Sequence, residues 1–430
     1  VETIDATSIS PAAFFDKYVK KRIPVKLIGC IADKCWNGKA WTDLKYLDDK
    51  CGQCDVKIER RAAPLEFSND FGNGLEKHMT FSEFLHAIQQ GDESLYMTTQ
   101  KLGYSAEGEP DIVSAPLTHL KGEYPWRPSL MGHLVTQNIN MWIGRSAAGT
   151  CSGLHHDHHD NLYILLKGKK QFKLFSPGEI DSMYVRGNVT RVHPNGRINY
   201  ANQSTRADGA DVAAGRAMQA SLKLEQLAAQ VKVTYIYCHS IIKYTLQYLQ
   251  ADDDSDAEDQ IDAALQDLLD AHMEGSDVSD CSEEESGSDA DFSDEQDVDP
   301  AGGLEGFLGP FGTAAEDEAA VAPTNFSQIV TSLPEDILKE RYPKFVEART
   351  RQLEVELNEG EMLYLPCGWF HEVTSMSVGV ASTAEGKGVS DSFHMAANYW
   401  FHPPDGSAFE LPYADSFWSD SWKLRQLDEK

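Results

Sequence analysis

Hydrophobic positions in the first 100 residues follow two spacings, one helical and one extended. The helical spacing predicts helices over 11–20 and 80–89, and the extended spacing predicts strands over 23–28 and 54–60. Thr80 stands at the N-cap of the second helix, and Glu83 three residues later completes a capping box. We expect residues 1–125 to form a helix-and-strand extension of a larger core.

From Asn138 onward the pattern changes to short strands separated by glycine, proline and asparagine. It predicts strands over 139–144, 161–167, 171–175 and 183–186 and a turn at 193–196, and later a helix over 334–341 and strands over 352–357, 361–365 and 395–401. Closely spaced strands with such turns are typical of a β-sandwich or barrel. We expect a mainly β core in two parts, 126–200 and 326–404, followed by a C-terminal tail over 405–430.

Residues 201–325 form a predicted insertion between the two parts. Residues 207–230 are rich in alanine and leucine at helical spacing, and the apolar stretch 231–249 fits a strand or a helix. Residues 251–320 hold 25 acidic residues and no lysine or arginine, which predicts an acidic, disordered segment. Five apolar residues there share one helical face, which favours a transient, locally packed helix over a docking helix for a partner: Ile261, Leu265, Leu268, Leu269 and Met273.

The formal charge of −30 comes mostly from this segment. The remaining 360 residues carry 43 acidic residues against 38 basic ones. Nothing here predicts direct nucleic-acid binding, which relies on clustered lysine and arginine. The near balance leaves room for a basic, histone-like protein substrate, which the acidic insertion would attract electrostatically.

Composition excludes several classes of protein. A hydrophobic content of 41% in 430 residues supports a large core and excludes collagen-like, wholly disordered and disulfide-dense chains. No apolar run approaches the roughly 18 residues of a membrane span. Eight scattered cysteines suggest a reducing compartment, and therefore the nucleus or cytoplasm. Four of them have the spacing C-x4-C-x15-C-x2-C, for which unrelated thiols are favoured over a zinc site: Cys30, Cys35, Cys51 and Cys54.

Residues 154–161, Leu-His-His-Asp-His-His-Asp-Asn, hold the densest set of metal-ligand types. In a strand, residues i and i+2 point to the same face, so His-x-Asp places an imidazole beside a carboxylate. This is two-thirds of the 2-His-1-carboxylate triad of non-haem Fe(II) oxygenases. Two registers satisfy it, His155 with Asp157 and His158 with Asp160. A His-rich surface loop without an ion is the alternative.

Two further segments extend this pattern. Lys170 shares a strand face with Phe172 and Leu174, so it is either a snorkelling surface lysine or a cation that meets an anionic group inside a barrel. In residues 360–375 a strand runs into a Pro-Cys-Gly turn and restarts with His371 on one face. An isolated histidine there is usually a hydrogen-bonded core residue, so its meaning depends on the first motif.

Taken in order, these segments resemble a known family. They are Ser-Gly-Leu-His-His-Asp at 152–157, Asn-Leu-Tyr at 161–163, the Gly-x-Lys step to Phe-Ser-Pro at 168–177, residues 360–371 and Asn-Tyr-Trp at 398–400. Together they resemble a JmjC domain of the cupin-like type, a family of Fe(II)- and 2-oxoglutarate-dependent oxygenases, over roughly 14–200 and 326–404. The resemblance implies a double-stranded β-helix. The long insertion departs from the family pattern and leaves substrate choice open.

The resemblance also implies a set of site residues. It selects His155, Asp157 and His371 as ligands of Fe(II), with 2-oxoglutarate as co-substrate and O2 as oxidant. Lys170 would pair with the distal carboxylate of 2-oxoglutarate. Ser152, Asn161 and Asn398 would lie at the co-substrate. Trp400 would line the pocket.

The expected function is a dioxygenase that hydroxylates a protein side chain. Demethylation of N-methyl-lysine or N-methyl-arginine in histones or other proteins is the near alternative, because it uses the same chemistry. The sequence lacks a reader-type zinc module, which favours hydroxylation. A cupin that kept the fold as a non-catalytic binding module, or a metal-dependent isomerase, would be alternatives of another class.

Overall fold

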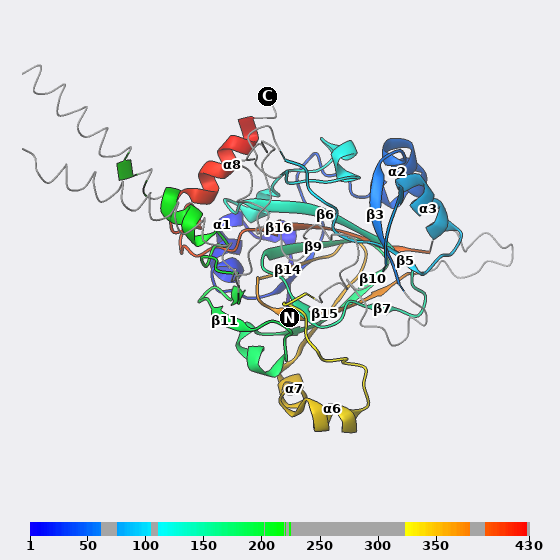
Figure 1. Cartoon of the computed structure of the whole chain (residues 1–430). Helices are drawn as coiled ribbons and strands as arrows, with labels where there is room; N and C mark the ends of the chain where they lie inside the picture. Colours follow the sequence, from blue (N-terminus) through cyan, green and yellow to red (C-terminus); the bar gives the residue numbers. More distant parts are fainter. Residues whose placement is uncertain are drawn as a thin grey trace, which may run out of the picture. The chain divides into compact units, whose positions relative to one another are not determined.

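The computed structural model describes residues 1–61, 75–104, 111–201, 203–218, 220, 223–224, 323–378 and 392–427 (Figure 1). The chain divides into two units, one of residues 1–203, 207–209 and 313–430, and one of residues 204–206 and 210–312. The predicted acidic segment 251–320, its apolar helical face and the stretch 231–249 lie outside the described residues. Of the predicted helix over 207–230, residues 212–218 are helical.

Two β-sheets form the core of the first unit. The larger has the strand order β1-β2-β14-β9-β16-β6-β5-β3-β4, and the smaller β13-β10-β15-β7, with β8 also paired to β15. Strands of the larger sheet are β1 (Glu2–Asp5), β2 (Val25–Ile28), β3 (Asp55–Arg60), β4 (Leu75–Thr80), β5 (Leu95–Met97), β6 (Thr136–Gly144), β9 (Asp160–Lys167), β14 (Met362–Leu365) and β16 (His394–Phe401). Strands of the smaller sheet are β7 (Thr150–Cys151), β8 (His155–His156), β10 (Lys169–Phe175), β13 (Leu353–Leu357) and β15 (Phe370–Met376).

The sheets form a double-stranded β-helix, because successive core strands alternate between them. From β6 the chain crosses to β7 and β8, returns in β9, crosses to β10 and β13, returns in β14, crosses to β15 and ends in β16. Because successive side chains of a strand point to opposite faces, every second residue of these strands faces the interior. An apolar cluster from both sheets fills it, and its members include Tyr163, Phe172, Leu174, Leu363 and Ala396.

The N-terminal residues are joined to this core. Helix α1 (Pro11–Phe14) continues into the π-helical turn η2 (Phe15–Val19), and α2 (Leu44–Cys51) and α3 (Phe81–Gln89) follow. Thr80 caps α3, and the predicted capping box with Glu83 is present. Because β2 pairs with β14 and β5 pairs with β6, the extension widens the core sheet at both edges.

After residue 322 the chain returns through α6 (Glu335–Arg341) and α7 (Pro343–Ala348), and α8 (Phe417–Leu427) ends the described chain. Short 3-10 turns connect these elements at η1 (Ala6–Ser8), η3 (Ala40–Thr42), η4 (Leu117–Leu120), η5 (Ser129–Met131), η6 (Pro177–Ser182) and η8 (Arg349–Arg351). The hairpin β11 (Val189–Val192) and β12 (Ile198–Tyr200) flanks the predicted turn at 193–196. The strand expected over 183–186 is wrong, because only an isolated bridge from Val185 to Ser327 forms there.

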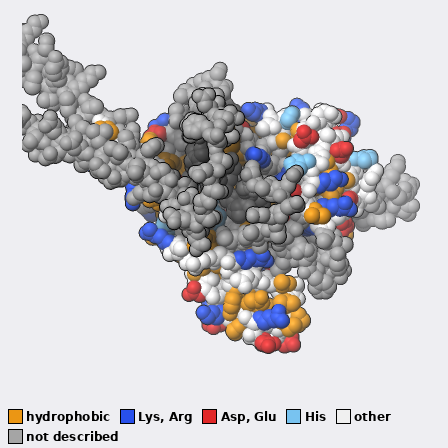
Figure 2. All heavy atoms as spheres, viewed as in Figure 1, with side chains coloured by type: hydrophobic (Ala, Val, Ile, Leu, Met, Phe, Trp, Pro, Cys, Tyr) orange, Lys and Arg blue, Asp and Glu red, His pale blue; other side chains and the backbone are white. Residues whose placement is uncertain are grey.

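On the face shown in Figure 2, basic and acidic side chains of the described residues are interspersed. Hydrophobic side chains gather at the α6 and α7 end, where Leu333, Tyr342 and Val346 are partly buried against an apolar cluster. No helix within the described ranges is long and apolar enough to cross a membrane.

Candidate metal centre

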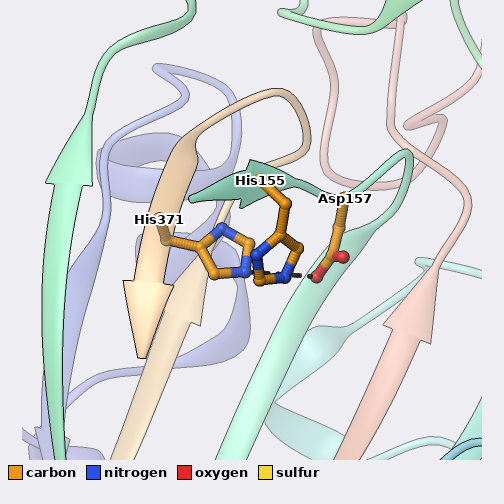
Figure 3. Close-up of side chains that lie close together, drawn as sticks. All are labelled: His155, Asp157 and His371. Atoms are coloured by element: carbon orange, nitrogen blue, oxygen red, sulfur yellow. Dashed lines mark ion pairs between the residues drawn. The ribbon is translucent and has the colours of Figure 1, made fainter. Parts of the chain in front are cut away.

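Three predicted ligand residues meet where β8 pairs with β15. The antiparallel register places His155 directly opposite His371, and their ring centroids lie 4.3 Å apart. Asp157 follows β8 by one residue. Figure 3 shows the two imidazoles and the Asp157 carboxylate turned toward one another. His371 Nε2 lies 3.8 Å from Asp157 Oδ2, and one ligand atom from each residue lies within 4.8 Å of the other two.

Backbone carbonyls orient both histidines. His155 Nδ1 is 3.0 Å from the Gly153 carbonyl, and His371 Nδ1 is 3.0 Å from the Trp369 carbonyl. Since a carbonyl oxygen only accepts hydrogen bonds, each Nδ1 carries the proton, and the lone pair is on Nε2. Metal-bound histidines are commonly fixed by such a hydrogen bond on the second ring nitrogen.

The environment keeps the donor set suited to a cation. Both histidines are buried, and Asp157 retains 17% of its side-chain exposure. Burial, with a smaller contribution from His371, lowers the pKa of His155 to about 3. A neutral His155 therefore keeps its lone pair at physiological pH.

A chain of amides supports Asp157. Asn161 Nδ2 donates to Asp157 Oδ2 at 3.2 Å, and Asn398 Nδ2 donates to Asn161 Oδ1 at 3.0 Å. Asn398 Oδ1 in turn accepts from Trp142 Nε1 at 2.8 Å and from Asn140 Nδ2 at 3.2 Å. The two predicted co-substrate residues Asn161 and Asn398 thus form a hydrogen-bonded link from β6 through β16 and β9 to the carboxylate.

The geometry also separates the two registers that the motif allows. Asp160 is fully buried and pairs with both terminal nitrogens of Arg22, and it accepts from the Tyr364 hydroxyl at 2.6 Å and the Cys367 N–H at 3.0 Å. Within the described ranges His155, Asp157 and His371 are the one group with metal-ligand spacing. Neither His158 with Asp160 nor the four N-terminal cysteines form another.

Lys170 lies on the same interior wall as the triad. On β10 and β15, Leu174 is opposite His371 and Lys170 is opposite Ser375. Lys170 is only 1% exposed, and its ammonium donates to the Ser375 hydroxyl. Burial, and secondarily the charge of Arg61, lowers its pKa to about 7. A snorkelling surface lysine is therefore excluded.

His394 is the first residue of β16 and is buried. Both of its ring nitrogens are buried and have no hydrogen-bond partner among the described residues. Burial, followed by the charges of Lys170 and Arg61, holds its pKa well below the ordinary value. Buried polar atoms usually find partners, so His394 and Lys170 together indicate a place for an anionic ligand.

Ser152 and Trp400 have different surroundings from Lys170. The Ser152 hydroxyl donates to the Gly153 carbonyl at 2.9 Å and accepts from the Val373 N–H at 3.0 Å. Trp400 packs edge-on against Trp142 at 6.3 Å, and its buried indole N–H has no partner among the described residues. The hydroxyl beside Lys170 therefore belongs to Ser375.

Sequence reasoning missed Ser375 and His394, although the signal was present. Ser375 is four residues from His371 on β15, and His394 is four residues from Asn398 on β16. A period of two puts each on the interior face of its strand.

The comparisons with known proteins concern the family of the chain. A family model described as a cupin-like domain matches residues 11–407. The "JmjC domain-containing protein 4" of Schizosaccharomyces pombe is 31% identical over 446 residues, which cover 95% of this chain and 86% of that protein.

Two relatives with reaction names align over shorter stretches. "Lysine-specific demethylase JMJ32" of Arabidopsis thaliana is 25% identical over 189 residues, 41% of this chain and 51% of that protein. The human "Bifunctional peptidase and (3S)-lysyl hydroxylase JMJD7" is 35% identical over 70 residues, 16% of this chain and 21% of that protein. The family match over most of the chain and the long alignment decide the assignment: this chain belongs to the cupin-like family of JmjC-domain proteins.

Proposed function

We propose that this protein is an Fe(II)- and 2-oxoglutarate-dependent oxygenase that hydroxylates a side chain of a protein substrate. The observation that carries the proposal is the convergence of His155, Asp157 and His371, with a buried lysine on the same wall.

The donor set fits Fe(II). Two neutral imidazoles and one carboxylate suit this ion, and a site with three protein ligands would leave positions for the co-substrate and O2. Hydrogen bonds from Nδ1 of each histidine to the Gly153 and Trp369 carbonyls leave both Nε2 lone pairs free to bind a metal ion. Asn161 orients the Asp157 carboxylate.

A buried ammonium beside a hydroxyl suits the distal carboxylate of 2-oxoglutarate. Lys170 is four residues along β10 from the position opposite His371, about 13 Å at strand spacing. A lysine side chain and a five-carbon dicarboxylate are together long enough to span the distance from the Lys170 backbone to the triad. A bound carboxylate would offer the Lys170 ammonium a charge-assisted hydrogen bond and give the Ser375 hydroxyl a further partner. His394, whose ring nitrogens are buried without a partner among the described residues, would be a further hydrogen-bond donor.

When bound, Fe(II) and 2-oxoglutarate would supply the oxidising chemistry, in which one oxygen atom of O2 converts the co-substrate to succinate and CO2 and the other enters the substrate. The protein's part is to orient and shield. Lys170 and Ser375 would fix one end of the co-substrate, the triad would hold the metal at the other end, and the apolar interior around Phe172 and Leu174 would exclude water.

Lysine is the first substrate residue to assay. The reaction names of the human and Arabidopsis relatives both specify lysine, one for hydroxylation and one for demethylation. Because both reactions begin at a C–H bond, the geometry of the triad is compatible with either.

Succinate formation from 2-oxoglutarate is the decisive measurement. We expect the wild-type chain to release succinate in an Fe(II)-dependent way and His155→Ala to lose at least 95% of it. His133→Ala removes a half-exposed histidine outside the triad and serves as the matched control. If the wild-type chain binds no iron and forms no succinate, the oxygenase proposal fails, and a non-catalytic cupin module becomes the better description.

The same reaction on lysine-containing peptides separates the two activities by mass. A gain of about 16 mass units marks hydroxylation, and a loss of about 14 on N-methylated peptides marks demethylation. We expect the gain, since hydroxylation of an unmodified side chain is the proposed reaction.

A further inference from the structure

A segment far away in the sequence completes the sheet edge on which His155 lies. Residues 324–328, here called the clamp segment, come just after residues 225–322 and lie between β8 and residues 184–187. Ser327 N–H donates to the Leu154 carbonyl at 2.8 Å, and His156 N–H donates to the Asn325 carbonyl at 3.3 Å. The Asn325 side chain also donates to the His156 carbonyl at 2.6 Å.

The clamp segment is itself held on its other side. The Phe326 carbonyl accepts from Arg186 N–H at 2.8 Å, and Gln328 N–H donates to the Tyr184 carbonyl at 2.9 Å. The Ser327 hydroxyl donates to the Met183 carbonyl at 2.6 Å. These contacts fix the clamp segment in place beside β8.

Without the clamp segment, β8 would be a weak edge. It is two residues long and pairs with β15 along one side only. A strand this short has few hydrogen bonds to hold its register, and the register decides which side chain faces the interior. The clamp segment supplies hydrogen bonds along the second side.

Phe326 adds a contact to the metal ligand itself. Its ring is stacked on the His155 imidazole, with centroids 4.7 Å apart and planes at 9°. His371 lies on the same imidazole at 4.3 Å and 54°. The imidazole is thus bounded by two rings, and rotation away from Asp157 would require it to leave the stack with Phe326.

We propose that Phe326 is a positioning residue for His155, and that the clamp segment holds β8 in the register that the metal centre requires. The inference rests on the proposed metal centre and names the residues that hold one of its ligands, His155, in place. It acts through His155 and not through contact with the reacting atoms.

The test measures metal affinity and not turnover. Phe326→Leu keeps an apolar side chain but removes the ring, and Phe326→Tyr keeps the ring. Phe409→Leu is the matched control, because Phe409 is also a partly buried phenylalanine that contacts a histidine, His133 at 5.0 Å, outside the triad. Cobalt(II) binding to each full-length variant is followed anaerobically by its visible spectrum and by competition with a chelator.

We expect Phe326→Leu to bind cobalt(II) about tenfold more weakly and with an altered spectrum. Phe326→Tyr and Phe409→Leu should keep the wild-type affinity and spectrum. The proposal is overturned if Phe326→Leu keeps the wild-type affinity, or if Phe409→Leu weakens binding equally.

Hydrogen exchange on the metal-free protein gives an independent readout. Phe326→Leu should accelerate amide exchange in the peptide that covers residues 150–160, while Phe409→Leu leaves it unchanged; equal exchange in both variants and the wild type would contradict the clamp. This arm needs no bound metal. A wild-type chain that binds no cobalt(II) therefore refutes the proposed function, whereas the exchange data still decide the inference.

Discussion

Lys170 illustrates a conflict between stability and binding at a single residue. A buried ammonium without a counter-charge is costly, and the pKa of about 7 reflects that cost. The folded chain therefore holds a proton on Lys170 less tightly than the unfolded chain, whose lysine keeps an ordinary pKa of 10.5. A co-substrate carboxylate would relieve the cost, so the residue is unfavourable until its ligand binds.

Lys170→Met should therefore stabilise the ligand-free protein, by an amount on the order of a few kcal/mol. Between pH 7 and 10.5 the unfolded wild-type chain binds more protons than the folded one. The free energy of unfolding of the wild type therefore increases as the pH rises through this range. The advantage of the variant should be largest at pH 7 and below and should fade toward pH 10.5. Denaturant unfolding at several pH values measures it.

The same variant should lose the co-substrate. We expect the Kd for 2-oxoglutarate to rise by at least about tenfold in Lys170→Met, measured by calorimetry on the metal-loaded protein. A variant that is stabilised yet binds 2-oxoglutarate normally would show that the buried lysine has another role.

Asn161 distinguishes support of the metal from contact with co-substrate. Its side-chain amide donates to Asp157, so Asn161→Ala should weaken metal affinity about tenfold even when 2-oxoglutarate is absent. Asn358→Ala removes an exposed amide that donates to the Glu361 carboxylate at 3.2 Å, outside the triad, and is the matched control. Metal affinity unchanged in Asn161→Ala, with only a raised KM for 2-oxoglutarate, would instead support the role that the family resemblance implies.

At the level of elements, one buried ion pair ties the N-terminal segment to the barrel. Arg22 follows η2, Asp160 opens β9, and the pair is joined by Tyr364 of β14 and by the Cys367 N–H. Arg22 adopts a left-handed backbone conformation with φ of 57°, unusual for a residue with a side chain. In this conformation the Arg22 guanidinium pairs with the Asp160 carboxylate, which is fully buried.

Asp160→Asn should lower the free energy of unfolding by about 3–5 kcal/mol, because it leaves the Arg22 charge buried without its partner. Asp49→Asn removes an exposed partner of Lys45 and should change stability by less than about 1 kcal/mol. Adding Arg22→Met to Asp160→Asn should recover part of the loss. A mild effect of Asp160→Asn on unfolding, with loss of metal binding, would return the His158 and Asp160 register to consideration.

At the level of the whole molecule, charge is unevenly divided along the chain. Residues 251–320 hold 25 acidic residues and no basic ones, while the rest is close to balance. We propose that this segment recruits a basic protein substrate. Long-range attraction of this kind is screened by salt, with a range of about 10 Å at 0.1 M ionic strength.

Deletion of residues 252–299 tests recruitment. We expect the deletion variant to bind a lysine- and arginine-rich peptide more weakly than the full chain at low salt, as measured by fluorescence anisotropy. At about 0.5 M salt the two chains should bind the peptide with equal affinity. Cobalt(II) affinity should be unchanged and is the control for folding. Equal peptide binding by both chains at low salt would exclude recruitment.

Local patterns predicted the elements of the barrel well, because strands and helices follow from residues near in sequence. The predicted strands over 161–167 and 395–401 correspond to β9 and β16, and the capped helix to α3. The pattern failed at 183–186, where hydrogen bonds go to the clamp segment and no ladder forms. That partner lies about 140 residues away, so no local signal identified it.

The sequence by itself determined the ligand types, the His-x-Asp spacing that sets an imidazole beside a carboxylate, and the strand face that Lys170 shares with Phe172. Only the tertiary structure grouped His155 and Asp157 with His371, placed Ser375 at Lys170, and brought Phe326 onto His155. The reason is physical: a period of two fixes which face of a strand a side chain takes, whereas its neighbour across the sheet depends on pairing between strands that are more than 200 residues apart in sequence.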